Sequence, residues 1–155
     1  MFVHNETATI DWEVFVAVAD IDKQLCFALY STSNRVTSMY RQLLEPLGLT
    51  YTQFVVLMVL WKEDALSISQ LAQRAALSKA TMTPLLKRLE QKGLIRREAL
   101  PDNDRQKSVV LTQEGRELSL DSADITDKVF CMTGLTAEEA NLMITLCAKI
   151  GVEAE

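Results

Sequence analysis

Three helix-start signals lie close together in this chain and constrain how it can fold. Thr50 and Ser67 are each followed three positions later by a glutamine, which is the pattern of a capping box. Ser78 supplies another hydroxyl cap shortly afterwards. Helix starts this close together leave room only for short helices. The two helices that flank residues 76–79 have the layout of a helix-turn-helix.

The second helix of this pair should run through residues 80–91 and stop at Gly93. Pro84 lies inside it, and proline removes a backbone hydrogen bond unless it occupies the first turn of a helix. Either the regular helix begins near Thr83, or the turn before it is distorted. We predict a helix start between Ser78 and Thr81.

A β-hairpin is expected directly after this helix. Residues 94–100 mix apolar and charged positions, residues 108–111 form a short β-branched run, and a polar turn at 101–105 separates them. The pattern predicts a wing with a basic, exposed tip.

Longer helices are expected on both sides of this segment. Apolar residues recur at helical spacing from Asp22, the predicted N-cap, to about Leu44, and Pro46 and Gly48 should end that helix. Thr112 should cap a further helix, and a third capping box opens a C-terminal helix that carries apolar side chains. A thin winged helix cannot cover so much apolar surface, which predicts a homodimer with a shared helical interface. A monomeric α-bundle is the alternative.

The length and composition fit one domain. The chain has 155 residues, is 48% hydrophobic and 24% charged, and contains only 3 prolines and 5 glycines. We predict a mainly α fold with a small β-wing. Residues 1–21 should be an N-terminal extension or an arm folded on the dimer. Residues 22–155 should be a single domain, with the winged helix-turn-helix at 50–112 and a helical dimerisation region at 22–46 and 113–152.

Several classes of protein are disfavoured. The cysteines Cys26, Cys131 and Cys147 lack the spacing of a zinc site, and the only histidine is His4, so neither a metal nor another cofactor is expected. The apolar stretch 10–19 is acidic and too short to cross a bilayer, and no basic residue precedes it as in a secretory signal. We expect a cytoplasmic protein without membrane contact, in which thiols stay reduced until an oxidant reaches them.

The net charge of −5 hides a basic segment. Residues 74–107 carry nine Lys or Arg and four Asp or Glu, which gives them +5 and leaves −10 for the remainder. A local basic surface can bind phosphates because acidic groups beyond about 10 Å are largely screened. A solvated charged surface is the alternative, but its place in a helix-turn-helix favours double-stranded DNA as the partner.

The order of these elements resembles the MarR family of dimeric winged-helix regulators. Three runs further resemble its organic-hydroperoxide-sensing branch, the OhrR type, in its two-cysteine subclass. They are Gln-Leu-Cys-Phe-Ala-Leu-Tyr at 24–30, Leu-Glu-Pro-Leu-Gly-Leu-Thr-Tyr at 44–51 and Thr-Pro-Leu-Leu-Lys-Arg-Leu-Glu at 83–90. The resemblance covers about residues 22–150 and implies a repressor that leaves its operator when a cysteine is oxidised.

The resemblance also implies roles for single residues. Cys26 matches the sensing cysteine, Tyr40 and Tyr51 match two tyrosines that hydrogen-bond it, and Cys131 is the natural match for the resolving thiol. Cys147 lies in an apolar run and fits a buried small hydrophobe better. Two sites depart from the pattern, the recognition-helix entry at 78–81 and Asn103 at the wing tip, and both bear on which operator is read.

Helix geometry decides which tyrosines can reach the sensing thiol. Tyr40 lies 14 residues after Cys26, or about 21 Å along one helix, so contact requires the helix of a partner subunit. Tyr30, one turn away, shares this sensor pocket or packs in the core. Phe27 and Leu29 would line it and favour an organic hydroperoxide as signal. The positive end of the helix dipole favours the reactive thiolate, although Asp22 opposes this.

The DNA-contacting residues follow from the helix-turn-helix layout. Ser78, Lys79, Thr81 and Thr83 at the recognition-helix entry should meet base edges. Lys87 and Arg88 are better placed for phosphates. Arg105 should enter a minor groove, with Arg96 and Arg97 near the DNA backbone.

Two other functions compete with a hydroperoxide-controlled repressor. One is a related regulator that responds to another oxidant, to a mixed disulfide with a small thiol, or to a non-covalent phenolic ligand. The other is an enzyme that consumes peroxide through Cys26, which we disfavour because no peroxidase scaffold is recognisable.

Overall fold

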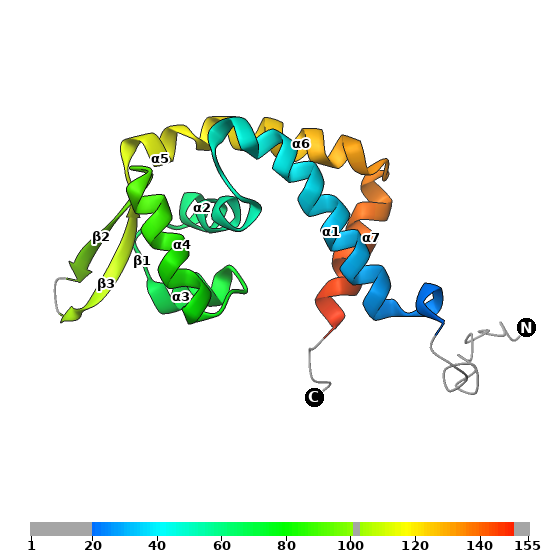
Figure 1. Cartoon of the computed structure of the whole chain (residues 1–155), viewed down its shortest axis with the longest axis horizontal. Helices are drawn as coiled ribbons and strands as arrows, with labels where there is room; N and C mark the ends of the chain where they lie inside the picture. The colour runs from blue at the N-terminus through cyan, green and yellow to red at the C-terminus, as the bar shows by residue number, and fades with distance from the viewer. Residues whose placement is uncertain (1–19, 101–102, 151–155) are drawn as a thin grey trace, which may run out of the picture. The chain divides into compact units, whose positions relative to one another are not determined.

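The computed structural model describes residues 20–100 and 103–150, and the side chains of 100–106 lie outside this description. The chain divides into two compact units, Met1–Arg35 and Val36–Glu155, each described by itself. Helix α1 (Leu25–Leu44) begins in the first unit and ends in the second (Figure 1). The second unit continues with α2 (Tyr51–Lys62), β1 (Leu66–Ser67), α3 (Ile68–Arg74), α4 (Lys79–Gln91), β2 (Ile95–Leu100), β3 (Asn103–Leu111), α5 (Gln113–Glu117), α6 (Ser119–Thr133) and α7 (Ala137–Lys149).

The start of α1 differs from the prediction. Asp20, not Asp22, is the capping residue, because its carboxylate accepts a hydrogen bond from the Asp22 backbone N–H at 3.2 Å. It caps a short 3-10 helix, Ile21–Lys23, and α1 begins only at Leu25. Cys26 is therefore the second residue of α1 rather than the fourth after a cap.

The predicted caps of the second unit are confirmed. Thr50, Ser67 and Thr136 each form a complete capping box, while Ser78 and Thr112 cap α4 and α5 with their hydroxyls. Gly48 ends the turn after α1 in the left-handed conformation, with φ 63°. Gly93 follows α4 with φ 72°, as the stop signal predicts.

Helix α4 begins at Lys79, within the predicted interval, and continues through Pro84. Proline cannot donate to the carbonyl four residues before it, so this helix lacks one backbone bond. Burial of its other face compensates for this loss. Met82, Leu85, Leu86 and Leu89 are all buried in the core.

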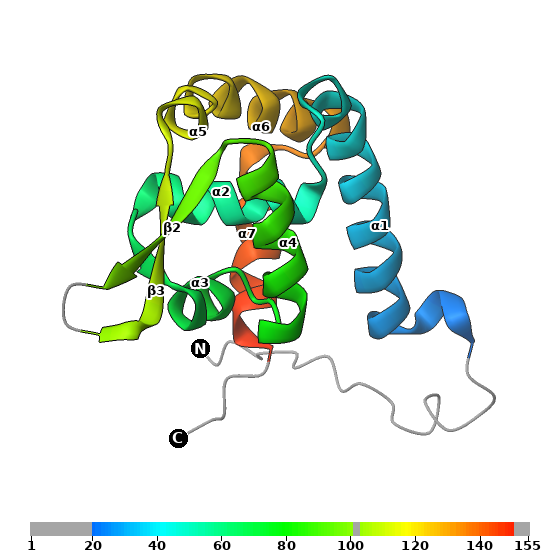
Figure 2. The ribbon, with the colours of Figure 1, turned by 60° about the vertical axis from the view of Figure 1, so that its left-hand side comes forward.

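A three-stranded antiparallel sheet carries the wing, with strand order β1-β3-β2. The hairpin of β2 and β3 extends from the unit beside α3 and α4 (Figure 2). The two-residue strand β1 was not predicted. It pairs with the base of β3, with Leu66 opposite Val109. The predicted mainly α fold with a small β-wing is confirmed.

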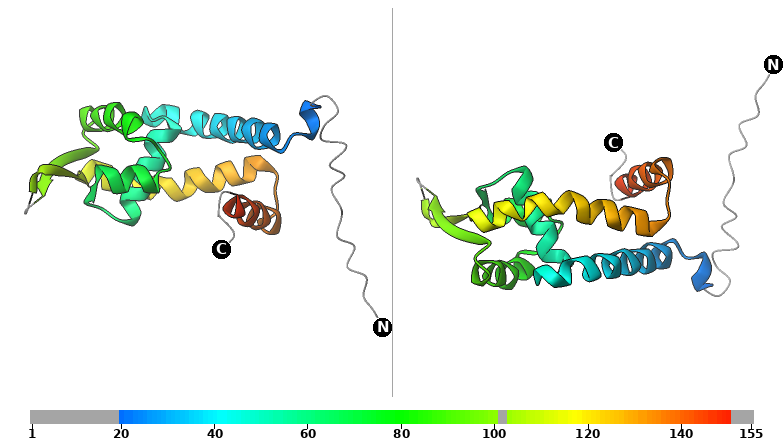
Figure 3. Two further views of the ribbon diagram at one scale, coloured as in Figure 1. Left: turned by 90° about the horizontal axis from the view of Figure 1, so that it is seen from below. Right: turned by 90° about the horizontal axis from the view of Figure 1, so that it is seen from above.

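The core is formed by side chains of α2 and of the winged helix. Phe54, Leu57, Leu71, Met82 and Leu86 are almost completely buried there. Helix α6 follows α5 along almost one line (Figure 3) and buries only Ile125 and Val129. Helix α7 buries no residue, and Leu142, Ile144 and Leu146 on it are each at least half exposed. The two last helices thus carry apolar faces that this single chain leaves uncovered.

Candidate DNA interface and thiol sites

The entry of α4 presents its polar side chains to solvent. Ser78, Lys79, Thr81 and Thr83 are exposed, because the buried leucines and Met82 occupy the opposite face of the helix. The Ser78 hydroxyl accepts from the Thr81 backbone N–H at 3.1 Å and lies 2.8 Å from the Thr81 hydroxyl. Both hydroxyls therefore have partners before any DNA arrives, and the pairing sets their orientation.

Lys87 and Arg88 are exposed farther along α4. Arg88 also lines a cleft of about 150 Å³ between the start of α2 and α4, together with Thr50, Thr52, Gln53, Thr81, Pro84 and Leu85. Thr50 and Thr52 were not predicted at this position. Their capping pattern was visible in the sequence, but the neighbouring α4 was not.

The arginines of the wing differ in their partners. Arg96 is exposed and donates to Glu98 on the same strand. Arg97, expected near the DNA backbone, is instead half-buried and donates to Glu90 of α4. That hydrogen bond holds the pKa of the Glu90 carboxyl below its usual value. Arg97 thus ties β2 to α4 and corrects the sequence-based assignment, while Arg105 lies in β3 with its side chain outside the described residues.

All three cysteines are exposed and reduced. Cys26 lies in the first turn of α1, which contains no acidic residue. Cys131 lies near the end of α6 and Cys147 near the end of α7. The expectation that Cys147 is a buried small hydrophobe is wrong for the single chain, because Cys147 is exposed.

Tyr40 and Tyr51 lie side by side within the second unit, with ring centroids 4.7 Å apart. Tyr40 also contacts Phe54, at 5.8 Å between centroids. Burial raises the pKa of the Tyr40 phenol, and the nearby Tyr51 raises it further. Tyr40 therefore stays a neutral hydrogen-bond donor at physiological pH.

The other two predicted pocket residues lie in the first unit. Tyr30 is 65% exposed and Phe27 is 36% exposed. The alternative of ordinary core packing for Tyr30 is thus wrong for the single chain. Both rings belong to an uncovered apolar stretch of α1 that also includes Leu25 and Leu29.

A larger cleft, of about 660 Å³, was not foreseen from the sequence. Val55, Met58 and Val59 of α2 form its apolar wall, and Lys62, Glu63 and Arg74 its polar end. Arg74 donates to Glu63, and this hydrogen bond lowers the pKa of the carboxyl. The one sequence signal for this cleft was the spacing of the apolar residues in α2, which indicated a helix face that the core does not cover.

The described residues contain no group of three or more His, Cys, Asp or Glu side chains arranged for a metal ion. None of their helices is by itself long and apolar enough to cross a membrane, although the bent pair Leu25–Leu47 and Tyr51–Lys62 passes the same criterion of length and composition.

Comparison with known proteins places the chain among transcription regulators. The family model described as MarR family matches residues 49–107. The HTH-type transcriptional regulator TtmR of Methylorubrum extorquens is 41% identical over 130 residues, which cover 84% of this chain and 67% of that protein. The organic hydroperoxide resistance transcriptional regulator of Bacillus subtilis is 34% identical, over 77% of this chain and 81% of that protein.

A solved structure extends the likeness to three dimensions. The crystal structure of overoxidised AbfR bound to DNA, a protein of Staphylococcus epidermidis, has a TM-score of 0.68 and 30% identity. The match covers 84% of this chain and 92% of that one.

Proposed function

The chain belongs to the MarR family of winged-helix transcription regulators, and on that premise we propose that it is a redox-sensing repressor. It binds an operator as a homodimer and releases it when Cys26 is oxidised by an organic hydroperoxide. The observation that carries the proposal is the exposed Cys26 in the first turn of α1, within an apolar stretch. Similarity to a hydroperoxide resistance regulator supports it.

The DNA-binding surface consists of the α4 entry and the wing. The exposed side chains of Ser78, Lys79, Thr81 and Thr83 suit base edges in a major groove. Lys87, Arg88 and Arg96 suit phosphates, and Arg105 suits a minor groove. The basic charge of residues 74–107 supports this assignment, and so does a neighbour solved on DNA.

The sensor is a site shared by two subunits. Cys26 and Tyr40 are 14 residues apart in one helix, which separates them by about 21 Å. The Tyr40–Tyr51 pair therefore serves the Cys26 of the partner subunit, to which its hydroxyls donate. Phe27 and Tyr30 line the pocket beside the thiol and favour an apolar peroxide.

The chemistry begins with attack of the Cys26 thiolate on the peroxide O–O bond. An alcohol leaves, and Cys26 becomes a sulfenic acid. The thiol of Cys131 then attacks that sulfur, a disulfide forms, and water leaves. A disulfide needs Cα atoms within about 7 Å, so its formation draws helices together and rotates the two winged modules. Their spacing then no longer matches successive major grooves, which lie ~34 Å apart.

Titration of operator release tests this proposal. Cumene hydroperoxide should release the DNA at a lower concentration than hydrogen peroxide, and Cys26→Ser should abolish release. In Cys131→Ser the unresolved sulfenic acid is open to a second peroxide, which oxidises it to a sulfinic acid that a dithiol cannot reduce, so recovery after excess peroxide should be lost. Cys147→Ser is the matched control on the neighbouring helix. Unchanged release and recovery in Cys131→Ser would exclude Cys131 as the resolving thiol. Mass mapping of the oxidised dimer without reductant identifies the linked cysteines.

A second candidate function rests on the cleft of about 660 Å³ beside α2. Its apolar wall of Val55, Met58 and Val59, with Lys62 and the Arg74–Glu63 pair at one end, suits a small phenolic ligand bound without covalent chemistry. A regulator that responds to another oxidant or to a small-thiol mixed disulfide remains the related alternative. Release of the operator by a phenolic acid in Cys26→Ser would favour the cleft as the sensor site. Release by peroxide in the wild-type protein but not in Cys26→Ser favours the thiol.

The comparisons bear on the enzymatic alternative as well. The matching family model and both relatives named above are of transcription regulators. Sustained turnover of peroxide with a dithiol reductant would be the result that favours an enzyme.

A further inference from the structure

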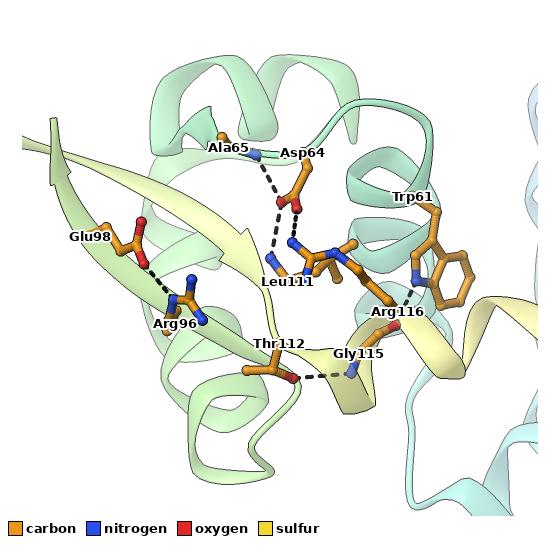
Figure 4. A network of polar contacts seen from close by, with 9 residues as sticks. All are labelled: Trp61, Asp64, Ala65, Arg96, Glu98, Leu111, Thr112, Gly115 and Arg116. Atoms are coloured by element: carbon orange, nitrogen blue, oxygen red, sulfur yellow. Dashed lines mark hydrogen bonds and ion pairs between the residues drawn. The ribbon is translucent and has the colours of Figure 1, made fainter. Parts of the chain in front are cut away.

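One carboxylate holds together the base of the wing. Asp64 follows α2, and its side chain contacts two other elements (Figure 4). Oδ1 accepts from the backbone N–H of Ala65 at 2.8 Å and of Leu111 at 2.9 Å. Oδ2 accepts from the Arg116 guanidinium at 2.9 Å. None of these contacts was predicted from the sequence.

The strand register explains why a side chain is needed at this point. Leu66 pairs with Val109, so continuation of the antiparallel ladder would place residue 64 opposite Leu111. The backbone cannot continue, because Ala65 has a left-handed φ of 61°. Leu111 is only 2% exposed, and a buried N–H needs an acceptor. The Asp64 carboxylate supplies the acceptor that the interrupted strand lacks.

The same end of α2 also holds α5. Arg116 and Gly115 both belong to α5, and the Trp61 indole N–H donates to the Gly115 carbonyl at 2.7 Å. On the other side, the Thr112 hydroxyl donates to the Gly93 carbonyl at 2.6 Å. These hydrogen bonds therefore join the end of α2, the base of β3 and α5 into one block, and α6 follows α5 in the chain.

We infer that Asp64 is a positioning residue for operator binding. It acts at Leu111, the end of β3 opposite the hairpin turn, and so sets the direction of the whole hairpin. Nine residues of strand span roughly 27 Å. A rotation of about 10° at the base thus moves the tip by roughly 5 Å, enough to withdraw it from a groove. This inference rests on the proposed operator binding but is independent of Cys26 oxidation.

The test compares hydroxyl-radical footprints on a duplex that the wild-type protein selects from a randomised pool. Asp64→Ala removes every contact of the carboxylate, whereas Arg116→Gln removes only the link to α5. Lys128→Gln is the charge-matched control for Arg116→Gln, because Lys128 pairs with Asp124 on the exposed face of α6. Unfolding is measured in parallel, so that affinities are compared where each variant is fully folded.

We expect Asp64→Ala to bind about tenfold more weakly and Arg116→Gln about threefold, with Lys128→Gln within twofold of wild type. Protection should disappear only at the positions covered by the wing and persist where α4 lies, a selective loss that general destabilisation would not produce. Asp64→Ala with Arg116→Gln should bind like Asp64→Ala alone, since both act through one link.

Three results would overturn the inference. They are an unchanged Asp64→Ala footprint, a loss of protection spread evenly over the site, or a double variant whose defect is the product of the two single ones. If Asp64→Ala does not fold, Asp64→Asn replaces it, because the amide keeps an acceptor for the Leu111 N–H. Its operator affinity should equal that of Arg116→Gln, and wild-type affinity of Asp64→Asn would also overturn the inference. Absence of protection by the wild type itself would refute the proposed function, and this inference with it.

Discussion

Replacement of Gly115 by alanine tests how tightly α5 is packed on the winged helix. An ideal Cβ at this position would lie 2.0 Å from the Leu94 carbonyl oxygen and 3.2 Å from a methyl of Leu111. The obstacle is backbone, and the Thr112 N–H donates to that same oxygen at 3.1 Å, so the carbonyl cannot simply turn away. Helix α5 must therefore move outward by more than 1 Å to reach the 3.4 Å of ordinary contact.

Such overpacking usually costs about 1–3 kcal/mol or more, against a gain of about 1 kcal/mol when alanine replaces a helical glycine. Because the clash is with backbone, we expect a cost at the upper end of that range, about 3 kcal/mol, and therefore a net loss of about 2 kcal/mol in the free energy of unfolding. For a chain of 155 residues this corresponds to a fall in Tm of roughly 4–8 °C.

Urea denaturation at one fixed protein concentration measures this loss, since the stability of a homodimer depends on concentration. Gly134→Ala is the matched control. Gly134 has a left-handed φ of 71° but no atom within 4 Å of an added Cβ, so it reports backbone strain of about 1 kcal/mol without a clash. A loss for Gly115→Ala no larger than for Gly134→Ala would refute the reasoning, because the close approach of α5 to Leu94 would then carry no energetic consequence.

Three further predictions concern ionisable groups. Arg97 donates to Glu90 and lowers the pKa of the Glu90 carboxyl. The stabilisation of the fold by this pair is therefore complete above the pKa of an unfolded glutamate, about 4.3, and is lost as the pH falls through the lower pKa of the folded state. Glu90→Gln should lower the urea midpoint at neutral pH and flatten its decline in acid, and an identical acid profile would contradict this. Burial raises the pKa of Tyr40, so its contribution is complete below about pH 10 and is lost as the pH rises further. Tyr40→Phe should therefore be less sensitive to alkali than wild type, and a phenolate titration by ultraviolet absorbance should lose a group that ionises above the usual tyrosine value. Arg105→Ala should weaken operator binding about tenfold at physiological salt, and a change below threefold would argue against a wing contact.

Local signals in the sequence predicted the helix starts, because a capping hydroxyl and its glutamine or backbone partner lie within three residues. The start of α4 before Pro84 was also predicted correctly, because the apolar spacing of the helix outweighed one missing hydrogen bond. The start of α1 was misplaced because Asp20 and Asp22 are equally suitable caps, and only the backbone decides between them. Burial of Cys147 was predicted from its apolar neighbours, but burial also needs a second layer of structure packed over the helix, and Cys147 is exposed in the single chain.

The base of the wing lay beyond sequence reasoning for a different reason. Strand β1 has two residues, and its identity depends on pairing with β3 more than forty positions away. Asp64 gave no sign of a role because its partners, Leu111 and Arg116, are equally distant in the sequence. Arg97 was assigned to DNA because its charge is visible in the sequence, whereas its pairing with Glu90 is not.

The positions of the exposed apolar side chains suggest how oxidation of a cysteine changes DNA binding. Leu25 and Phe27 beside Cys26, and Phe130 and Met132 beside Cys131, are exposed in the single chain. Surface of this kind is normally covered in an assembly, and a second copy with the same faces can cover it. Oxidation would then place a polar sulfenic acid or a new bond inside the dimer interface rather than in the winged helix. Because the links through Trp61 and Asp64 hold the wing base and α5 as one block, we expect a strained interface to reorient that block without unfolding it.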